Sequence, residues 1–371
     1  MQRAIYGLKQ SGKQWNKEIH ASLIKLGFRR TRTDAGIYVY RRQEGYTEII
    51  LIIYVDDLLL CGPNKQLIKG IKADLQLIYQ MTDMGPAQNF LGLQFIRNRE
   101  LRYLDICQSD YWIAALARFG MTNCKTARTP LPAGCKLEKS TTQATPEFTT
   151  EFQSLIGTLI YGGIASRPDI HFAVIRLAQY SSNPSEAHMK FAKHILRYIA
   201  GTIHRRLRYQ GASSSGMISY DDSDWAANVE DRHSLTGHVI LFAEGAIAWA
   251  TRRQKTVALS STEAEYMALS DGCRLVAYFR NLFEELGEDM SNPTPICVDN
   301  QGAIFLAVNP AHDKRTKHID IRYHYVREFI EQGHGEIYYI PTNDQVADVM
   351  TKPLSFDKHA TFSGSLGLTD S

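Results

Sequence analysis

The sequence predicts a mixed α/β protein with more than one domain, and three observations support this. The chain has 371 residues, 44% of them hydrophobic, which is enough for two or three cores. Short strand-like runs alternate with helix-like segments along most of its length. Residues 129–146 contain three prolines among Thr, Ser and Lys, which is typical of a linker. We therefore expect three parts, with boundaries near residues 135 and 210.

The first two parts contain strands followed by helices. Residues 36–41, 48–54 and 58–61 are rich in β-branched and aromatic side chains and predict strands, the last two joined by a turn at Asp56-Asp57. A helix is expected over 64–79, a strand pair over 90–96 and 102–106, and a helix over 110–119. Residues 151–202 have helical spacing with breaks near the prolines at 168 and 184, so we expect a helical connection there. A short strand is expected after Thr202.

The third part begins after a Ser-rich break at 213–215 and has a specific element order. Strands are expected at 217–220, 236–242 and 246–251, the last two joined at Glu244-Gly245. The remaining expected elements are a helix over 263–286, a strand over 295–298, helices over 300–308 and 319–331, a strand over 336–340 and a short helix over 344–351. The order of three strands, then a helix alternating with further strands, predicts a layered domain.

Composition narrows the class of protein. The net charge of +3 with 22% charged residues excludes a highly basic chromatin-type binder. Six scattered cysteines form no CxxC pair and no zinc-finger spacing, so free thiols in a reducing compartment are expected. The longest apolar run, Ile49–Leu60, is too short to cross a bilayer, and the N-terminus shows no signal-peptide core. We expect an intracellular protein that is neither secreted nor membrane-bound.

Four carboxylates of the third part fall at the boundaries of expected elements. Asp222 follows the first strand, Glu265 lies in the first turn of the long helix, Asp299 ends a strand, and Asp348 lies in the last helix. Ends of adjacent strands and the helices packed on them can converge at one sheet edge. Converging carboxylates suit hard divalent cations, of which Mg²⁺ is usual near phosphates, with Mn²⁺ as an alternative. The alternative is that they are solvated acids near element ends.

A second acidic pair lies in the first part. Asp56 and Asp57 stand at the tip of the expected hairpin, at the end of an apolar strand that would support them rigidly. Such a pair can bind Mg²⁺ for phosphoryl transfer. An exposed acidic turn is the alternative reading.

Six segments of the third part resemble, in order and spacing, the ribonuclease H domain of copia-type retrotransposon polyproteins. They are YDDSDWA (220–226), DRHSLTGHV (231–239), WATRRQKTVALSSTEAEYMAL (249–269), CVDNQGAI (297–304), RTKHIDIRYHYVREF (315–329) and ADVMTKPL (347–354). The resemblance implies a three-layer α/β/α domain over residues 211–371. It also implies Mg²⁺-dependent cleavage of the RNA strand of RNA–DNA hybrids by two-metal hydrolysis.

Residue by residue, the resemblance implies that the catalytic and metal-binding acids are Asp222, Glu265, Asp299 and Asp348. Asp221 and Asp224 compete with Asp222, which occupies the first Asp of the family's Asp-x-Asp-Trp pattern. Glu263 competes with Glu265, which begins the Glu-x-x-Ala pattern of related enzymes.

Segments of the first two parts resemble the reverse transcriptase of the same family. They are AIYGLKQSGKQW (4–15), YVDD (54–57), FLGLQF (90–95), SLIGTLIYGGIASRPDIHFAV (154–174) and ILRYIAGT (195–202). The resemblance implies a palm hairpin and a thumb-like segment in residues 1–135, with catalytic and metal-binding Asp56 and Asp57. Residues 136–210 would then be the helical connection.

The family's third polymerase Asp belongs to a motif upstream of YGLKQ, which this chain does not contain. We therefore expect a truncated palm that has lost RNA-directed DNA polymerase activity, fused to an active ribonuclease H. The competing hypothesis is an inactive transposon relic that only binds nucleic acid. An integrase-type strand transferase would show its acids in the order Asp, Asp, Glu, whereas this chain gives Asp, Glu, Asp, Asp.

Basic and aromatic residues are expected to contact nucleic acid. The candidates are Lys9, Gln10, Trp15, Tyr54, Arg253, Lys255, Arg315 and Lys317. The implied partners are an RNA–DNA hybrid, an RNA template and a DNA primer, with a second copy of the chain or other polyprotein products as further candidates. The implied location is the cytoplasm, in virus-like particles, or the nucleus.

Overall fold

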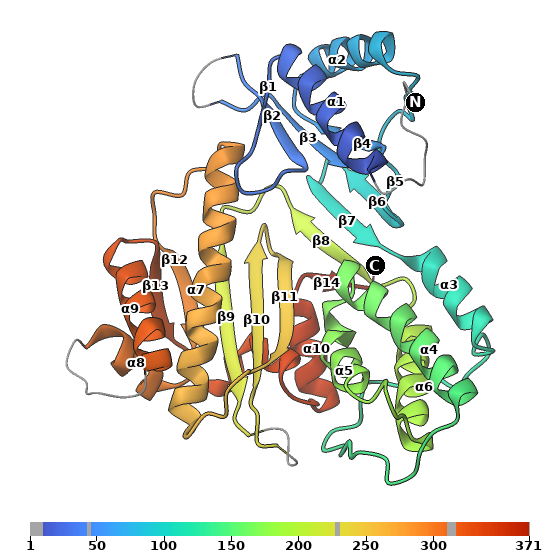
Figure 1. Ribbon diagram of the computed structural model, residues 1–371, viewed down its shortest axis with the longest axis vertical. Helices are drawn as coiled ribbons and strands as arrows, with labels where there is room; N and C mark the ends of the chain where they lie inside the picture. The colour runs from blue at the N-terminus through green and yellow to red at the C-terminus, as the bar shows by residue number, and fades with distance from the viewer. Residues whose placement is uncertain (1–9, 43–45, 227–230, 310–316, 371) are drawn as a thin grey trace. The chain divides into compact units, whose positions relative to one another are not determined.

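The computed structural model describes residues 10–42, 46–226, 231–309 and 317–370, with the backbone alone for residues 317–321. The chain divides into two compact units. One comprises Met1–Ala87 and Ala277–Asn292, and the other comprises Gln88–Val276 and Pro293–Ser371. Within the described residues the first unit contains one sheet and the second contains two (Figure 1). The mixed α/β class predicted from the sequence is confirmed.

The first unit is an antiparallel four-stranded sheet packed with two helices. Its strands follow chain order and are β1 (Phe28–Arg30), β2 (Ile37–Tyr40), β3 (Ile49–Tyr54) and β4 (Asp57–Cys61). Its helices are α1 (Ser11–Lys25) and α2 (Lys65–Ile78). Ile71 and Leu75 of α2 lie one turn apart and share a core with Leu51 of β3, as the predicted helical spacing requires. The Asn64 side chain accepts two backbone hydrogen bonds and so begins α2.

β3 and β4 form the predicted hairpin, with its turn one residue earlier than predicted. Tyr54 pairs with Asp57 in the ladder, so the turn residues are Val55 and Asp56. Val55 has a φ of 56°, a left-handed conformation that closes the tight turn. Asp57 begins the returning strand, and all four side chains are exposed at the tip.

The second unit joins a sheet from distant parts of the chain to a helical core. The sheet order is β14 (Leu368–Thr369), β8 (Arg206–Gln210), β7 (Tyr103–Cys107), β6 (Leu93–Asn98) and β5 (Asn89–Phe90), with antiparallel neighbours. The helices are α3 (Ser109–Arg118), α4 (Pro146–Ala165), α5 (Pro168–Ala178) and α6 (Glu186–Gly201). The predicted helix break at Pro168 is confirmed, since this proline is the first residue of α5.

A buried ion network links α5 to the C-terminal elements. Arg167 donates to both carboxylate oxygens of Asp169, each at 2.8 Å, and the two side chains are at most 1% exposed. His359 Nε2 of α10 (Phe356–Ser365) lies 3.0 Å from the Asp169 carbonyl oxygen. Arg205 lies 3.4 Å from the Asp169 carboxylate and 2.7 Å from that of Asp370. Both oxygens of the buried Asp169 carboxylate therefore have cationic partners, as a buried charge requires.

The other sheet of the second unit is mixed and carries the candidate site. Its order is β11 (Gly245–Arg253), β10 (Leu235–Phe242), β9 (Ile218–Asp224), β12 (Thr294–Val298) and β13 (Gly335–Tyr339). β9, β10 and β11 are antiparallel neighbours, whereas β9, β12 and β13 are parallel. The accompanying elements are α7 (Ser261–Leu286), α8 (Gln301–Val308), α9 (Lys317–Glu331) and the 3-10 turns η1 (Thr342–Asp344) and η2 (Val346–Met350).

This mixed sheet lies between two layers. On one face, the Asp221 carboxylate of β9 lies directly against Gly272 of α7. On the other face, Gly237 of β10 lies against Met350 and Thr351, at the end of η2. The strand order and the layers are those of the ribonuclease H-like three-layer domain that the sequence predicts.

Three features differ from the sequence prediction. β9 continues to Asp224, so Asp222 lies inside the strand and does not follow it. The predicted last helix over 344–351 consists of 3-10 turns, in which Gln345 caps the second turn. Four elements were not predicted, namely α1, β1, α10 and β14. None of the helices in the described part of the chain is long and apolar enough to cross a membrane.

Candidate active site

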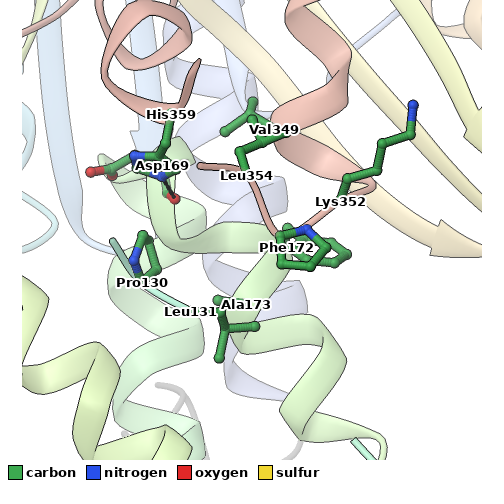
Figure 2. A pocket seen from close by; sticks show the side chains of 10 residues that line it. Pro130, Leu131, Asp169, Phe172, Ala173, Val349, Lys352, Leu354 and His359 are labelled. Atoms are coloured by element: carbon green, nitrogen blue, oxygen red, sulfur yellow. Dashed lines mark hydrogen bonds between the residues drawn. The ribbon is translucent and has the colours of Figure 1, made fainter. Parts of the chain in front are cut away.

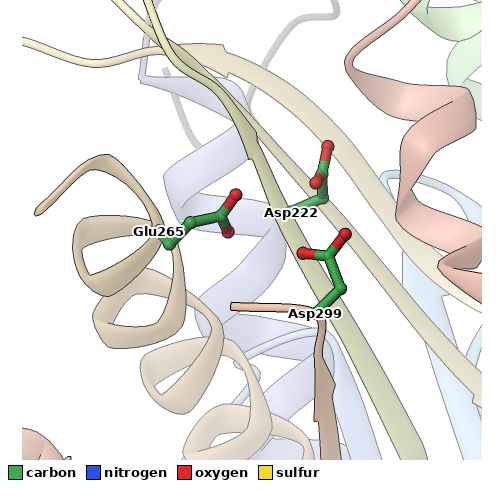
Figure 3. Close-up of side chains that lie close together, drawn as sticks. All are labelled: Asp222, Glu265 and Asp299. Atoms are coloured by element: carbon green, nitrogen blue, oxygen red, sulfur yellow. The ribbon is translucent and has the colours of Figure 1, made fainter. Parts of the chain in front are cut away.

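Three carboxylates from different elements meet at one end of the mixed sheet. Ligand oxygens of Asp222, Glu265 and Asp299 all lie within 4.8 Å of one another. Figure 3 shows the three side chains close together, on β9, near the start of α7 and on the residue that follows β12. The sheet register explains the meeting, because parallel β9 and β12 pair Tyr220 with Cys297. Two residues further on, Asp222 and Asp299 therefore lie side by side.

Asp348 lies beside this group and is held by two lysines. Lys352 Nζ lies 2.6 Å from Asp348 Oδ1 and 3.4 Å from Asp222 Oδ2, and so joins the two acids. Lys358 Nζ lies 2.7 Å from the other oxygen of Asp348. The Thr351 hydroxyl donates a hydrogen bond to Asp222. The structure thus brings three of the four predicted acids into one group and connects the fourth to it through Lys352.

Burial makes the carboxyl groups of Asp222 and Glu265 difficult to ionise without a cation. Asp222 is 1% exposed and Glu265 is 7% exposed. Burial raises the pKa of Asp222 to about 6; the neighbouring Asp348 adds to this shift, and the Lys352 ammonium opposes it. Burial, together with the neighbouring charges of Asp222 and Asp299, raises the pKa of Glu265 to about 9. Such perturbed carboxyl groups are typical of functional sites.

The residues fit a hard divalent cation. All donors in the group of three are carboxylate oxygens, the ligands that Mg²⁺ and Mn²⁺ prefer. Glu265 Oε2 is buried and has no hydrogen-bond partner among the described residues. An unpartnered buried carboxylate oxygen is costly, and a cation bound to it would remove that cost.

The competing acids have other partners. Asp221 lies on the opposite face of the sheet from Asp222, against α7. Its carboxylate lies 2.5 Å from His238 Nδ1 of the neighbouring strand β10. The Glu263 carboxylate accepts a hydrogen bond from the Leu259 N–H at 2.9 Å, before the start of α7. This geometry favours the predicted choices of Asp222 and Glu265, whose catalytic roles stay predictions.

Two predicted nucleic-acid-binding residues lie on and beyond β11. Arg253 is exposed and its guanidinium contacts Asp231 at 2.5 Å, whereas Lys255 is exposed in the loop that follows. Lys9 and Arg315 lie outside the described residues, as does the side chain of Lys317. Their predicted contacts with nucleic acid stay predictions.

The first unit contains the second predicted acidic site. Asp56 and Asp57 are exposed at the hairpin tip, and in the described part of the chain no third His, Cys, Asp or Glu completes a group with them. The Trp15 indole N–H donates to the carbonyl oxygen of Val55, and its ring packs edge-on against Tyr79 at 5.3 Å. Trp15 therefore supports the hairpin turn.

Two other predicted contacts of the first unit lie on its surface. Tyr54 is 57% exposed at the end of β3, and Gln10 is exposed at the start of α1. The roles proposed for both side chains stay predictions.

The sequence prediction did not single out Thr351, Lys352 or Lys358. The signal that could have found Lys352 is its position four residues after Asp348, a spacing at which opposite charges meet along a helix. Lys358 lies ten residues after Asp348 and reaches it only through the fold.

Comparisons with known proteins agree with these motifs. Residues 1–133 match the family model described as reverse transcriptase (RNA-dependent DNA polymerase). The retrovirus-related Pol polyprotein from transposon TNT 1-94 of Nicotiana tabacum is 36% identical over 363 residues, which cover 96% of this chain and 27% of that relative. The chain therefore spans about a quarter of that polyprotein's length. Among solved structures, the RNase H1 of Halobacterium salinarum NRC-1 is similar with a TM-score of 0.28 and 16% identity, over 37% of this chain and 95% of that chain.

A shorter relative matches over most of its own length. The transposon Ty5-1 protein of Saccharomyces cerevisiae is 31% identical over 268 residues, which cover 72% of this chain and 86% of the relative. With this coverage, and with the motifs in their family order, the chain belongs to the copia-type retrotransposon polyproteins and includes their reverse transcriptase region.

Proposed function

We propose that the second unit is a Mg²⁺-dependent ribonuclease H that hydrolyses the RNA strand of RNA–DNA hybrids. The observation that carries the proposal is the group of Asp222, Glu265 and Asp299 at the end of the ribonuclease H-like sheet, with Asp348 beside it. Mn²⁺ is the alternative ion, because it accepts the same oxygen ligands.

The four acids would hold the ions and the protein would orient the substrate. Two bound ions would supply a nucleophile from water and stabilise the leaving oxygen. Asp222 and Asp299 are held in place by paired strands, and Glu265 by helix α7, so their oxygens are positioned before an ion binds. Arg253 and Lys255, exposed on β11 and beyond, would contact phosphates of the hybrid.

For the first unit we propose a role in RNA-directed DNA synthesis. Asp56 and Asp57 would bind Mg²⁺ at the hairpin tip, and Gln10, Trp15 and Tyr54 would lie near the template and primer. The match of residues 1–133 to the reverse transcriptase family supports this proposal. The boundaries expected near residues 135 and 210, an intracellular location and assembly with other polyprotein products are proposed on the same family resemblance.

The test uses the full chain and a labelled RNA–DNA hybrid with Mg²⁺. We expect endonucleolytic cleavage of the RNA strand, with single-stranded RNA and duplex DNA left intact. Asp299→Asn should abolish cleavage, because a neutral amide is a much poorer Mg²⁺ ligand. Asp357→Asn, which removes an exposed carboxylate in α10, is the matched control and should cleave normally. Hybrid binding without cleavage by folded wild-type protein would favour the inactive relic.

A further inference from the structure

Lys352 contacts the side-chain carboxylates of two of the four acids. It follows Thr351 directly after η2, and its ammonium lies 2.6 Å from Asp348 and 3.4 Å from Asp222. The side chain is 33% exposed, whereas both carboxylates are 1% exposed. Lys352 also lines a pocket of largely apolar side chains, and Figure 2 shows its ammonium end pointing away from them. The lysine is therefore anchored along its stem and charged at the acidic site.

The two sides of the acidic site differ in how their oxygens are used. Both oxygens of Asp348 already have an ammonium partner, one from Lys352 and the other from Lys358. Glu265 Oε2, on the other side, is buried without a hydrogen-bond partner among the described residues. The site thus has an open side at Asp222, Glu265 and Asp299, and a side filled by positive charge at Asp348.

We propose that Lys352 is a built-in cation that fills the second cation position, between Asp222 and Asp348, in the protein without substrate. This inference rests on the proposed metal-dependent function. The free protein then binds one divalent ion, at the open side. Lys352 acts through the two carboxylates, so it is a positioning residue and not a catalytic one.

The position of Lys352 allows it to leave when nucleic acid binds. One third of its side chain is exposed, and its flexible four-carbon stem lets the ammonium turn toward solvent. A backbone phosphate near the site offers the ammonium another anionic partner. Asp348 and Asp222 are then free to accept a second ion together with the substrate.

The test is a calorimetric titration of the full chain with Mn²⁺ alone. Wild type should bind one ion. Lys352→Gln should bind two ions, or bind the first at least about tenfold more tightly, because a like charge beside the ion has been removed. Lys72→Gln is the matched control: Lys72 Nζ lies 2.6 Å from Asp83, and its loss should leave the isotherm unchanged. Lys352→Arg keeps the charge and should bind one ion.

Thermal unfolding supplies an independent measurement. In EDTA, Lys352→Gln should melt below wild type, and Mn²⁺ should raise its melting temperature by more than it raises that of wild type. If this variant folds only with Mn²⁺, the ion has replaced the lysine, as proposed. Equal isotherms for wild type and Lys352→Gln would overturn the inference, as would two ions bound to wild type or to Lys352→Arg. If the isotherms are equal but wild type still cleaves the hybrid with metal, the proposed function stands and only the inference about Lys352 fails. If Lys352→Gln gains ion binding but wild type does not cleave, only the proposed function is contradicted.

Discussion

The neighbours Asp221 and Asp222 should differ in their effect on cleavage when each is replaced by asparagine. Asp222 lies close to Glu265 and Asp299, whereas Asp221 lies against Gly272 in the middle of α7 and contacts His238 at 2.5 Å. Because adjacent side chains of a strand face opposite sides of the sheet, only one of the two acids can belong to the acidic site. Asp222→Asn should therefore remove activity, whereas Asp221→Asn should keep most of it.

The magnitudes follow from burial. Burial raises the pKa of Asp222 from 3.8 to about 6, so its ionisation costs about 3 kcal/mol more in the folded chain than in the unfolded chain. Without divalent ions at pH 8, Asp222→Asn should therefore stabilise the protein by up to about 3 kcal/mol. Burial raises the pKa of Asp221 as well, but Asp221→Asn also weakens a buried hydrogen bond to His238, a loss of about 1–3 kcal/mol that offsets the gain, so this variant should be stabilised less than Asp222→Asn. Each kcal/mol corresponds to roughly 2–4 °C in melting temperature for a unit of this size.

Cleavage rates and melting temperatures together decide the matter. With saturating Mg²⁺ and a labelled hybrid, Asp222→Asn should lower the cleavage rate on the order of 10³-fold, or about 4 kcal/mol of transition-state stabilisation. Asp221→Asn should lower it by less than about tenfold, since it lies on the other face. Asp224→Asn, at the end of β9, is the third variant to measure. A larger cleavage loss at Asp221 than at Asp222 would refute the assignment of faces, and a lower melting temperature of Asp222→Asn in EDTA would refute the electrostatic argument.

Three further results are expected. Because burial raises the pKa of Glu265 to about 9, Glu265→Gln should raise the melting temperature in EDTA at pH 8 and remove the stabilisation by Mg²⁺. Scanning fluorimetry with and without Mg²⁺ measures both, and an unchanged stabilisation by Mg²⁺ would contradict a ligand role for Glu265. In wild type between pH 4.5 and 9, Glu265 keeps its proton in the folded chain but has lost it in the unfolded chain, so the metal-free stability should fall as pH rises toward 9 and the stabilisation by Mg²⁺ should grow. A stabilisation by Mg²⁺ that stays constant from pH 6 to 9 would count against this. Burial lowers the pKa of His171 to about 4, so wild type should lose about 2 kcal/mol of unfolding free energy between pH 7 and 5, as the His171 of the unfolded chain gains a proton. Urea unfolding of His171→Gln should show a smaller loss than wild type over that range, and equal losses would refute the assignment.

The sequence predicted the main elements well because their apolar spacing is strong. The apolar strand that ends at Val298 located Asp299, and the prolines located the breaks between α4, α5 and α6. α10 was missed because two of its three buried residues are His359 and Ser363, which interrupt any apolar spacing. β9 was predicted too short because Ser219, Asp221 and Ser223 are polar yet buried.

The site was only partly predictable for a similar reason. The family resemblance and the ends of the expected strands pointed to the four acids of the candidate site. Which basic side chains neutralise these acids depends on contacts made only in the folded chain. Lys358 comes from α10, an element that was not predicted, and its contact with Asp348 closes a loop of ten residues. The buried pair of Asp221 and His238 likewise joins two strands whose register is known only from the structure.

The buried Arg167–Asp169 network has a consequence for how such polyproteins can be divided. The network joins α5 to α10 and to Asp370, while β8 pairs on one side with β7 and on the other with β14. A fragment that starts at residue 211 would lack β8 and leave β14 without its strand partner in this sheet. The mixed sheet and the helices α4, α5 and α6 should therefore unfold as one cooperative body. Substitutions in the cores of these helices, far from any acid of the site, should therefore change the stability of the mixed sheet as well.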